Sequence, residues 1–402
     1  MPLLLIMRTS PPFLSIAGIV LLLTVVSRLA SSLYLPALPA MQESLQLSID
    51  TINHTLTVFF ACFALSTLVA GPITDTYGRR VVIQYGLVFF ILGSLVAGLA
   101  HTTGTLLIGR ALQAAGSAFI PVSGRTMIRD QYEDHEVVGV LGWVGTLGSL
   151  VPILAPILGG FIIEWADWRA TFYILAILGG LTFWLTWHIL PETMQNSLPL
   201  SRASIFTGYT QILGSKTFTL VVMPASLCFI IQGIYFATAP YIFVTVFELR
   251  PSIFGLATIP LVLSLLLGRS CATRNLQTHP AFSVYFFYSC FPLVGGTAMV
   301  VLEETGVIGP VSFLLAASVF TFGFGGLLPI SMKSVLTAWR ERGGMASALF
   351  GCCTIGAMSI GSAIAGIAGD NAHDKVMILA ILMLVLGIFI AASAACTRDS
   401  LA

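Results

Sequence analysis

Two arginines lie inside long runs of apolar residues, Arg28 in the run 13–34 and Arg110 in the run 105–127. At about 1.5 Å per helical residue, both fall at a similar depth within their runs. A charge inside an apolar span costs at least about 2.5 kcal/mol on insertion scales, so it usually serves a function. Guanidinium groups bind carboxylates and phosphates through paired hydrogen bonds. If both helices line one cavity, the two arginines therefore predict a positive pocket for an anion.

Neutral polar residues accompany both arginines. Thr24 and Ser31 share one helical face with Arg28, and Gln113 shares one with Arg110. Ser32, next to Ser31, is a further binding candidate. Structural alternatives remain open for each arginine. The long side chain of Arg28 can extend to the membrane interface or pair with an acid in a loop. The side chain of Arg110 can instead hydrogen-bond to a carbonyl of a broken helix.

A second candidate binding face lies in the run 218–243. Gln232 and Tyr235 are three residues apart on one helical face, and Phe236 is adjacent. These side chains can offer hydrogen bonds and an aromatic wall to a bound molecule. An aromatic stripe of this kind is also typical of helix packing, so both interpretations remain open.

Several other kinds of chemistry find no support in the sequence. The stretch 208–217 resembles a nucleotide-binding loop, but Ser215 separates its glycine from Lys216 and no strand precedes it. The seven cysteines lie in or beside apolar runs and show no ligand spacing with histidine. A net charge of +1 does not suit nucleic-acid binding, which needs clustered basic residues. We therefore expect no enzyme, no metal, no cofactor and no nucleic-acid partner.

The elements that position these residues are helices that cross a membrane. The chain is 57% hydrophobic and only 9% charged, whereas soluble domains contain about 25% charged residues. About 20 apolar residues span a bilayer. Twelve runs reach this length approximately, namely 13–34, 52–73, 81–100, 105–127, 137–162, 169–190, 218–243, 252–270, 281–302, 307–331, 344–368 and 376–396.

A less hydrophobic stretch, 191–217, divides the twelve runs six and six. We therefore predict an all-α membrane protein with a half formed by 1–190, a linker formed by 191–217, and a half formed by 218–402. A stretch that begins at Gly268 is weakly similar to the charged stretch 71–80, and we expect it to be another loop. Glycines recur in both 137–162 and 344–368, which indicates close helix packing in both halves.

The basic residues predict how the chain is oriented. With the N-terminus inside, the 18 Lys and Arg residues fall on the inside except for the two within spans and three on the outside, Arg169, Arg250 and Lys375. Short cytoplasmic loops are enriched in Lys and Arg. The sequence therefore predicts that both termini are cytoplasmic.

A charged stretch, G-P-I-T-D-T-Y-G-R-R from Gly71 to Arg80, separates the second run from the third. Its glycines and Pro72 predict a tight turn that ends the preceding helix. It resembles the signature loop of the major facilitator superfamily, roughly G-x-L-x-D-x-x-G-R-R/K, with Ile73 at the usual leucine. The resemblance implies a transporter in which two six-helix halves rock about a central cavity. The gate residues that it implies are Gly71, Asp75, Gly78, Arg79 and Arg80.

Further motifs narrow the resemblance. Pro156, Gly159 and Gly160 are similar to the P-x-x-G-G motif of drug exporters, and we expect them to form a bend. Y-L-P-A-L-P-A at 34–40 and L-P-E-T at 190–193 resemble the Bcr/CflA branch of drug:proton antiporters. This resemblance implies efflux of a small molecule across the bacterial inner membrane, with a proton gradient as a possible energy source and a monomer as the working unit.

The chain departs from that branch at Ser32, where an acidic residue usually precedes the Tyr-Leu-Pro sequence. The missing acid and the added Arg28 favour an alternative, a carrier of an anionic metabolite such as a polycarboxylate siderophore, in either direction. A membrane sensor on the same scaffold is a third hypothesis, but the loops are short for a further domain. The acidic run 129–136 is expected beside Arg79 and Arg80, either as a latch in one conformation or as a solvated loop.

Overall fold

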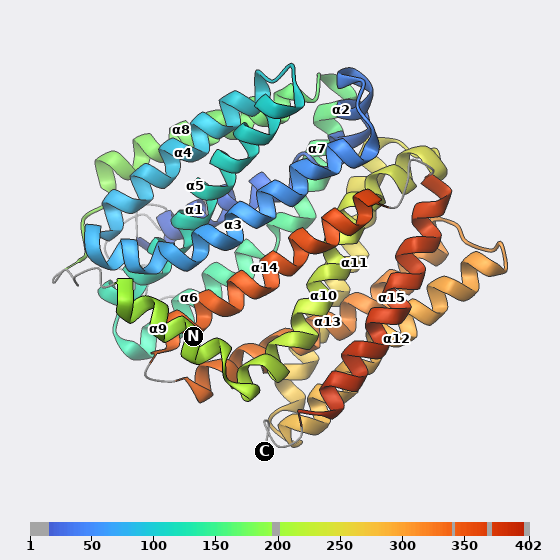
Figure 1. The fold of residues 1–402 in the computed structure, drawn as a ribbon. Coiled ribbons are helices and arrows are strands. Elements are labelled where there is room, and N and C mark those ends of the chain that lie inside the picture. The colour runs from blue at the N-terminus through green and yellow to red at the C-terminus, as the bar shows by residue number, and fades with distance from the viewer. Residues whose placement is uncertain (1–15, 195–201, 340–341, 368–371, 398–402) are drawn as a thin grey trace.

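The computed structural model describes residues 16–194, 202–339, 342–367 and 372–397, and these residues form a bundle of long helices (Figure 1). Within these ranges, twelve segments are long and apolar enough to cross a membrane. This confirms the predicted number of spans. The helices are α1 (Ile16–Ser32), η1 (Leu35–Ala37), α2 (Leu38–Leu45), α3 (Ile49–Tyr77), α4 (Arg79–Gly98), α5 (Thr103–Gln131), α6 (Asp134–Gly148), α7 (Val151–Trp165), α8 (Arg169–Ile189), α9 (Arg202–Leu213), α10 (Lys216–Tyr241), η2 (Ile242–Val246), α11 (Pro251–Asn275), α12 (Ala281–Glu304), α13 (Pro310–Ala338), α14 (Gly343–Ile367) and α15 (Ala372–Ala395).

Helices α1 to α8 form one group and helices α10 to α15 form another, which we call the N-terminal and C-terminal halves (Figure 1). The halves meet where α3 packs against α14 and where α7 packs against α11. Helix α9 lies in the stretch predicted as a linker and packs against α14 and α10. The main apolar core runs through both halves.

Glycines bring α4 and α5 of the N-terminal half into close contact. A Cβ added at Gly93 would lie 2.2 Å from the backbone nitrogen of Gln113, and one at Gly116 would lie 2.3 Å from the carbonyl oxygen of Gly86. Two backbones can approach this closely only where no side chain separates them. The small residues of the sequence therefore fix how these helices pack, and they hold Gln113 against α4.

The turn predicted within Gly71 to Arg80 is shorter than expected. Helix α3 continues through Pro72 and ends at Tyr77, and the chain reverses at Gly78, which has a φ of 98°. Glycine adopts that conformation without the strain that a side chain would cause. The predicted loop at 268–277 is also largely helical, because α11 continues to Asn275.

The helix of the fifth span is interrupted before Pro156, where a bend was predicted. The fifth span is interrupted at Ser149 and Leu150, and α7 then starts at Val151 with Pro152 in its first turn. A proline is tolerated in a first turn because the N–H that it lacks would have no helical partner there. Pro156 lies inside α7 and does not interrupt it.

Candidate substrate site

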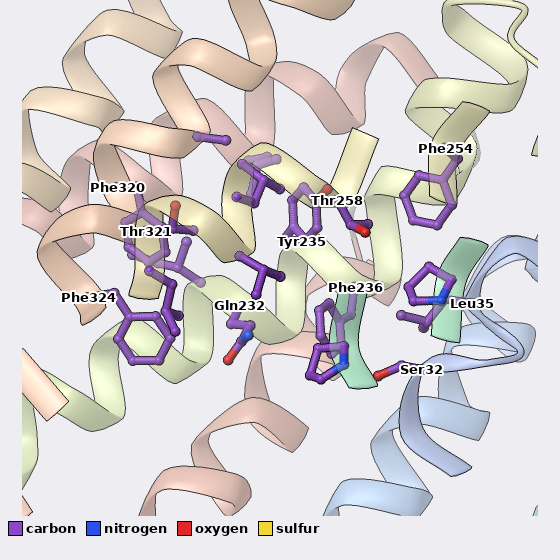
Figure 2. Close-up of a pocket in the computed structure, with 18 of the residues that line it drawn as sticks. Ser32, Leu35, Gln232, Tyr235, Phe236, Phe254, Thr258, Phe320, Thr321 and Phe324 are labelled. Atoms are coloured by element: carbon purple, nitrogen blue, oxygen red, sulfur yellow. The ribbon is translucent and has the colours of Figure 1, made fainter. Parts of the chain in front are cut away.

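A pocket lies between the two halves, bounded by α1, η1, α7, α10, α11, α13 and α15 (Figure 2). Its space free of atoms totals about 790 Å³, open solvent included. Aromatic side chains form much of its wall, and none of its lining residues is acidic. The aromatic residues are Tyr235, Phe236, Phe254, Phe320 and Phe324, and the polar residues are Ser32, Gln232, Thr258 and Thr321.

Three of the predicted binding residues, Ser32, Gln232 and Tyr235, line this pocket (Figure 2). Ser32 is the last residue of α1, and the other two project from α10. The hydroxyl of Tyr235 is buried and has no hydrogen-bond partner within the described part of the chain. A buried hydroxyl without a partner costs about 1–3 kcal/mol. A bound molecule that supplies a hydrogen-bond acceptor or donor to this hydroxyl would remove that cost.

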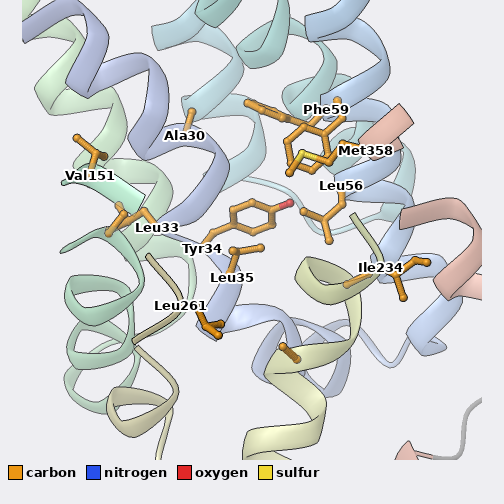
Figure 3. Close-up of a cluster of buried hydrophobic side chains, with 14 of the residues drawn as sticks. Ala30, Leu33, Tyr34, Leu35, Leu56, Phe59, Val151, Ile234, Leu261 and Met358 are labelled. Carbon is orange, nitrogen blue, oxygen red and sulfur yellow. The ribbon is translucent and has the colours of Figure 1, made fainter. Parts of the chain in front are cut away.

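Arg110 does not reach the pocket but lies in the core of the N-terminal half. Its side chain is fully buried, and its guanidinium carbon lies 4.0 Å from the ring centroid of Tyr34 and 4.1 Å from that of Phe59. Figure 3 shows these two rings within the apolar cluster. Its Nη1 donates to the carbonyl oxygen of Ala30 at 3.1 Å and to the amide oxygen of Gln113. The expected pairing of Arg110 with Arg28 in one pocket is therefore wrong, because aromatic rings and a helix carbonyl hold the charge elsewhere.

Gln113 continues this buried network. Its amide nitrogen donates to Ser94 Oγ at 2.8 Å, and Ser94 Oγ donates to the carbonyl oxygen of Phe90 at 2.7 Å. Helix α5 is thereby tied to α4 through Gln113 and to α1 through Arg110. In this conformation both residues stabilise the N-terminal half and do not line the pocket.

Arg28, in contrast, is exposed to the space between the halves. The Cβ that Gly148 lacks would lie 3.1 Å from the Thr24 side chain and 3.7 Å from Arg28 Nε, so the end of α6 passes directly beside both. The hydroxyls of Thr24 and Ser31 donate to carbonyl oxygens of their own helix, at 2.8 and 2.9 Å. Of the three residues predicted as one stripe, only Arg28 keeps its polar group free for a ligand.

Two further arginines, which the sequence analysis counted only among the charges on the inside, lie near Arg28. Arg125 of α5 and Arg269 of α11 are both exposed, and each lies close enough to Arg28 for their positive charges to repel. The sequence feature that could have identified Arg269 and Arg28 as neighbours of the pocket is their spacing from residues that line it. Arg269 follows the pocket residue Leu265 by four residues, and Arg28 precedes the pocket residue Ser32 by four. Each therefore lies one helical turn from the pocket.

The predicted gate residues form a network at one end of the bundle. Arg79 lies 3.2 Å from Asp75 and 2.8 Å from Asp130, and its backbone N–H donates to Glu192 at 3.0 Å. The Arg80 N–H donates to the same carboxylate at 3.1 Å. Because the first N–H groups of α4 have no helical partner, Glu192 caps this helix.

This network joins α3, α4, α5 and the end of α8, all within the N-terminal half. The predicted contact between Arg79 and the acidic run 129–136 is made by Asp130. Glu133 and Glu136 instead cap the start of α6. The role of Glu192 was not predicted, although the L-P-E-T motif that contains it was recognised.

The opposite end of the bundle is closed by contacts between the halves. A Cβ at Gly160 would lie 2.5 Å from the carbonyl oxygen of Pro251, so α7 and α11 touch through their backbones. Glu164 accepts hydrogen bonds from the N–H and hydroxyl of Ser252, at 3.2 and 2.5 Å. Gly159 instead packs within its own half, against the carbonyl oxygen of Leu33.

Towards the gate end the fifth span departs from the C-terminal half. Helix α6 packs against α1 and α5, and Cβ atoms added at Gly139, Gly142 and Gly145 would meet no heavy atom within 4 Å. The pocket is thus sealed at the Gly160 end, and the arginines lie on its other side. Two six-helix halves around a pocket, closed at one end, define a membrane transporter of the alternating-access type.

Comparison with known proteins identifies the family. A sequence profile of the Major Facilitator Superfamily matches residues 20–359, and the chain belongs to that family. It is therefore a transporter and not an enzyme.

Individual relatives include drug exporters. Multidrug resistance protein D of Escherichia coli (strain K12) is 27% identical over 355 residues, which are 85% of each chain. A bicyclomycin resistance protein homolog of Haemophilus influenzae is 32% identical over 171 residues, 42% of this chain and 43% of its own. A bacterial homolog of the human lysosomal transporter Spinster, in an inward-facing and unoccupied conformation, superimposes with a TM-score of 0.77 at 14% identity and covers 98% of both chains. The structural likeness shows the fold, and the relatives confirm the resemblance to drug:proton antiporters.

Proposed function

We propose that this protein exports bulky, largely apolar organic compounds by alternating access. The observation that carries the proposal is the aromatic pocket between the halves, which contains few polar groups and no acid among its lining residues. Ligand sites are typically apolar clefts with a small number of placed polar groups that fix orientation. The drug-resistance names of the relatives support the same substrate class.

The arginines towards the gate end and the Gly160 contacts suggest which side of the membrane the pocket faces. Arg79, Arg125 and Arg269 all lie towards the gate end, and Lys and Arg concentrate in cytoplasmic loops. We therefore place the gate end in the cytoplasm and the closed end outside, in the inner membrane of a bacterium. A reporter fused after residue 402 that is active only in the cytoplasm tests this orientation, and an inactive reporter contradicts it.

For proton exchange we propose the carboxylates at the ends of the bundle. Asp75 binds Arg79 at one end, and Glu164 binds Ser252 at the other. Protonation of Glu164 removes a contact between the halves, and protonation of Asp75 weakens the network at the gate end, so either step can couple a proton to the change of state. Flux with and without a pH gradient tests this coupling, and flux that ignores the gradient removes the antiporter assignment.

Reconstituted vesicles test the export proposal directly. Aromatic compounds of matched size and negative, zero or positive charge are screened for saturable flux above that of protein-free vesicles. Phe236→Ala and Gln232→Ala alter the pocket wall and are expected to raise the concentration needed for half-maximal flux. Phe206→Ala is the matched control, because Phe206 is 72% exposed on α9 outside the spans. An effect of the control as large as that of Phe236→Ala contradicts a binding role for the pocket.

A further inference from the structure

On three of the spans, a residue that lines the pocket lies one helical turn from an arginine or from a residue beside one. On α1, Arg28 lies four residues from Ser32, and on α11, Arg269 lies four residues from Leu265. In the fifth span, Gly148 beside Arg28 lies four residues from the pocket residue Pro152. Four residues of helix rise about 6 Å. The apolar pocket and the arginine group, which consists of Arg28, Arg125 and Arg269, are therefore adjacent parts of one space.

The arginines of this group lack protein counter-charges. Within the described residues, Arg28, Arg125 and Arg269 take part in no ion pair, whereas Arg79 and Arg169 do. The like charges of Arg28, Arg125 and Arg269 repel, so placing them near one another raises the electrostatic free energy of this conformation. Charged residues within spans normally pair with one another or with a substrate. A bound anion would supply such a partner.

We propose that the pocket and this arginine group together bind an amphipathic organic anion. The apolar or aromatic body occupies the pocket beside Phe236 and Phe324, and a carboxylate, sulfonate or phosphate group binds Arg28, with Arg269 adding charge from the C-terminal half. The proposal rests on the proposed function, because it takes the pocket as the place where cargo binds. It specifies the class of that cargo.

The placement of the arginines also links binding to movement. Arg28 and Arg125 belong to the N-terminal half and Arg269 to the C-terminal half, so the repulsion between Arg28 and Arg269 opposes closure of the gate end. An anion between them replaces that repulsion with attraction from both sides. Binding of the cargo therefore favours closure of the gate end, which is the step that an alternating-access transporter needs next.

The test compares two compounds of nearly the same shape, naphthalene-2-sulfonate and the uncharged naphthalene-2-sulfonamide. Binding is measured by calorimetry on the full chain in discs of neutral phosphatidylcholine. We expect the sulfonate to bind at least about tenfold more tightly, which corresponds to ~1.4 kcal/mol. Arg28→Gln should remove that preference and Arg28→Lys should restore part of it, since Lys keeps the charge without the paired hydrogen bonds. Arg250→Gln, an exposed arginine at the other end of α11, is the matched control and should change nothing.

The outcomes distinguish failure of the anion site from failure of the proposed export function. Equal binding of both compounds, unchanged by Arg28→Gln and Arg269→Gln, overturns the anion site but leaves the apolar pocket in place. No binding of either compound overturns the anion site and the proposed function together. Discs that contain phosphatidylglycerol distinguish the source of the anion. Competition by that lipid would support the anion site with a lipid as its occupant, whereas its absence would support a soluble anion.

Discussion

The contact at Gly160 offers a direct way to disturb one conformation of the transporter. In Gly160→Ala the new Cβ would lie 2.5 Å from the carbonyl oxygen of Pro251, and its nearest neighbours all belong to the C-terminal half. The packing within the N-terminal half is therefore unaffected. Overpacking of a tight contact costs about 1–3 kcal/mol. Since the contact exists only while this end is closed, the ratio of closed to open molecules should fall by a factor of about 5 to 150.

Hydrogen exchange at Ser252 reports that ratio. Its N–H lies in the first turn of α11, where no helical acceptor exists, and it donates instead to Glu164 across the two halves. We expect exchange in the segment after Pro251 to accelerate by the same factor in Gly160→Ala. Gly142→Ala is the matched control, because a Cβ there meets nothing within 4 Å. Unchanged exchange in Gly160→Ala, or equal acceleration in both variants, would refute the reasoning.

Three other substitutions test separate parts of the structure. Arg110→Gln leaves the Ala30 carbonyl without its donor and removes the aromatic contacts, so we expect a loss of roughly 2–4 kcal/mol in thermal unfolding; an unchanged melting temperature contradicts the structural role. Tyr235→Phe removes a buried hydroxyl without a partner, so the empty protein should melt higher while cargo binds more weakly, and weaker binding without stabilisation would argue against this account. Asp75→Asn breaks an exposed pair worth about 1 kcal/mol or less, so insertion should persist while flux falls; normal flux would exclude a gate role.

The sequence was sufficient for the fold because hydropathy and span length are local properties. Each apolar run maps to a span, although α3 extends past Pro72 because only Gly78 has the backbone conformation that reverses the chain. The interruption at Ser149 was missed for a similar reason. Proline marks a position where a helix can start as well as one where it can bend, and Pro152 starts α7.

The site was only partly predictable because depth in the membrane does not determine which way a side chain points. Arg28 and Arg110 have similar depths, yet one faces the space between the halves and the other is enclosed by Tyr34 and Phe59. Arg269 was counted as a loop charge because the stretch that begins at Gly268 resembles the charged loop 71–80, whereas α11 continues to Asn275. Its relation to Arg28 depends on how two distant helices pack, which no local pattern contains.

Uptake of naphthalene-2-sulfonate into phosphatidylcholine vesicles under an imposed membrane potential tests the central claim most directly. The compound is permanently charged and needs a carrier to cross the bilayer. A potential of 100 mV acts on one charge with about 2.3 kcal/mol, so the anion should accumulate at least roughly 50-fold on the positive side. We expect saturable accumulation that Arg28→Gln abolishes and Arg250→Gln preserves. Accumulation no greater than in protein-free vesicles, or insensitive to both the potential and Arg28→Gln, would contradict a carrier of amphipathic anions.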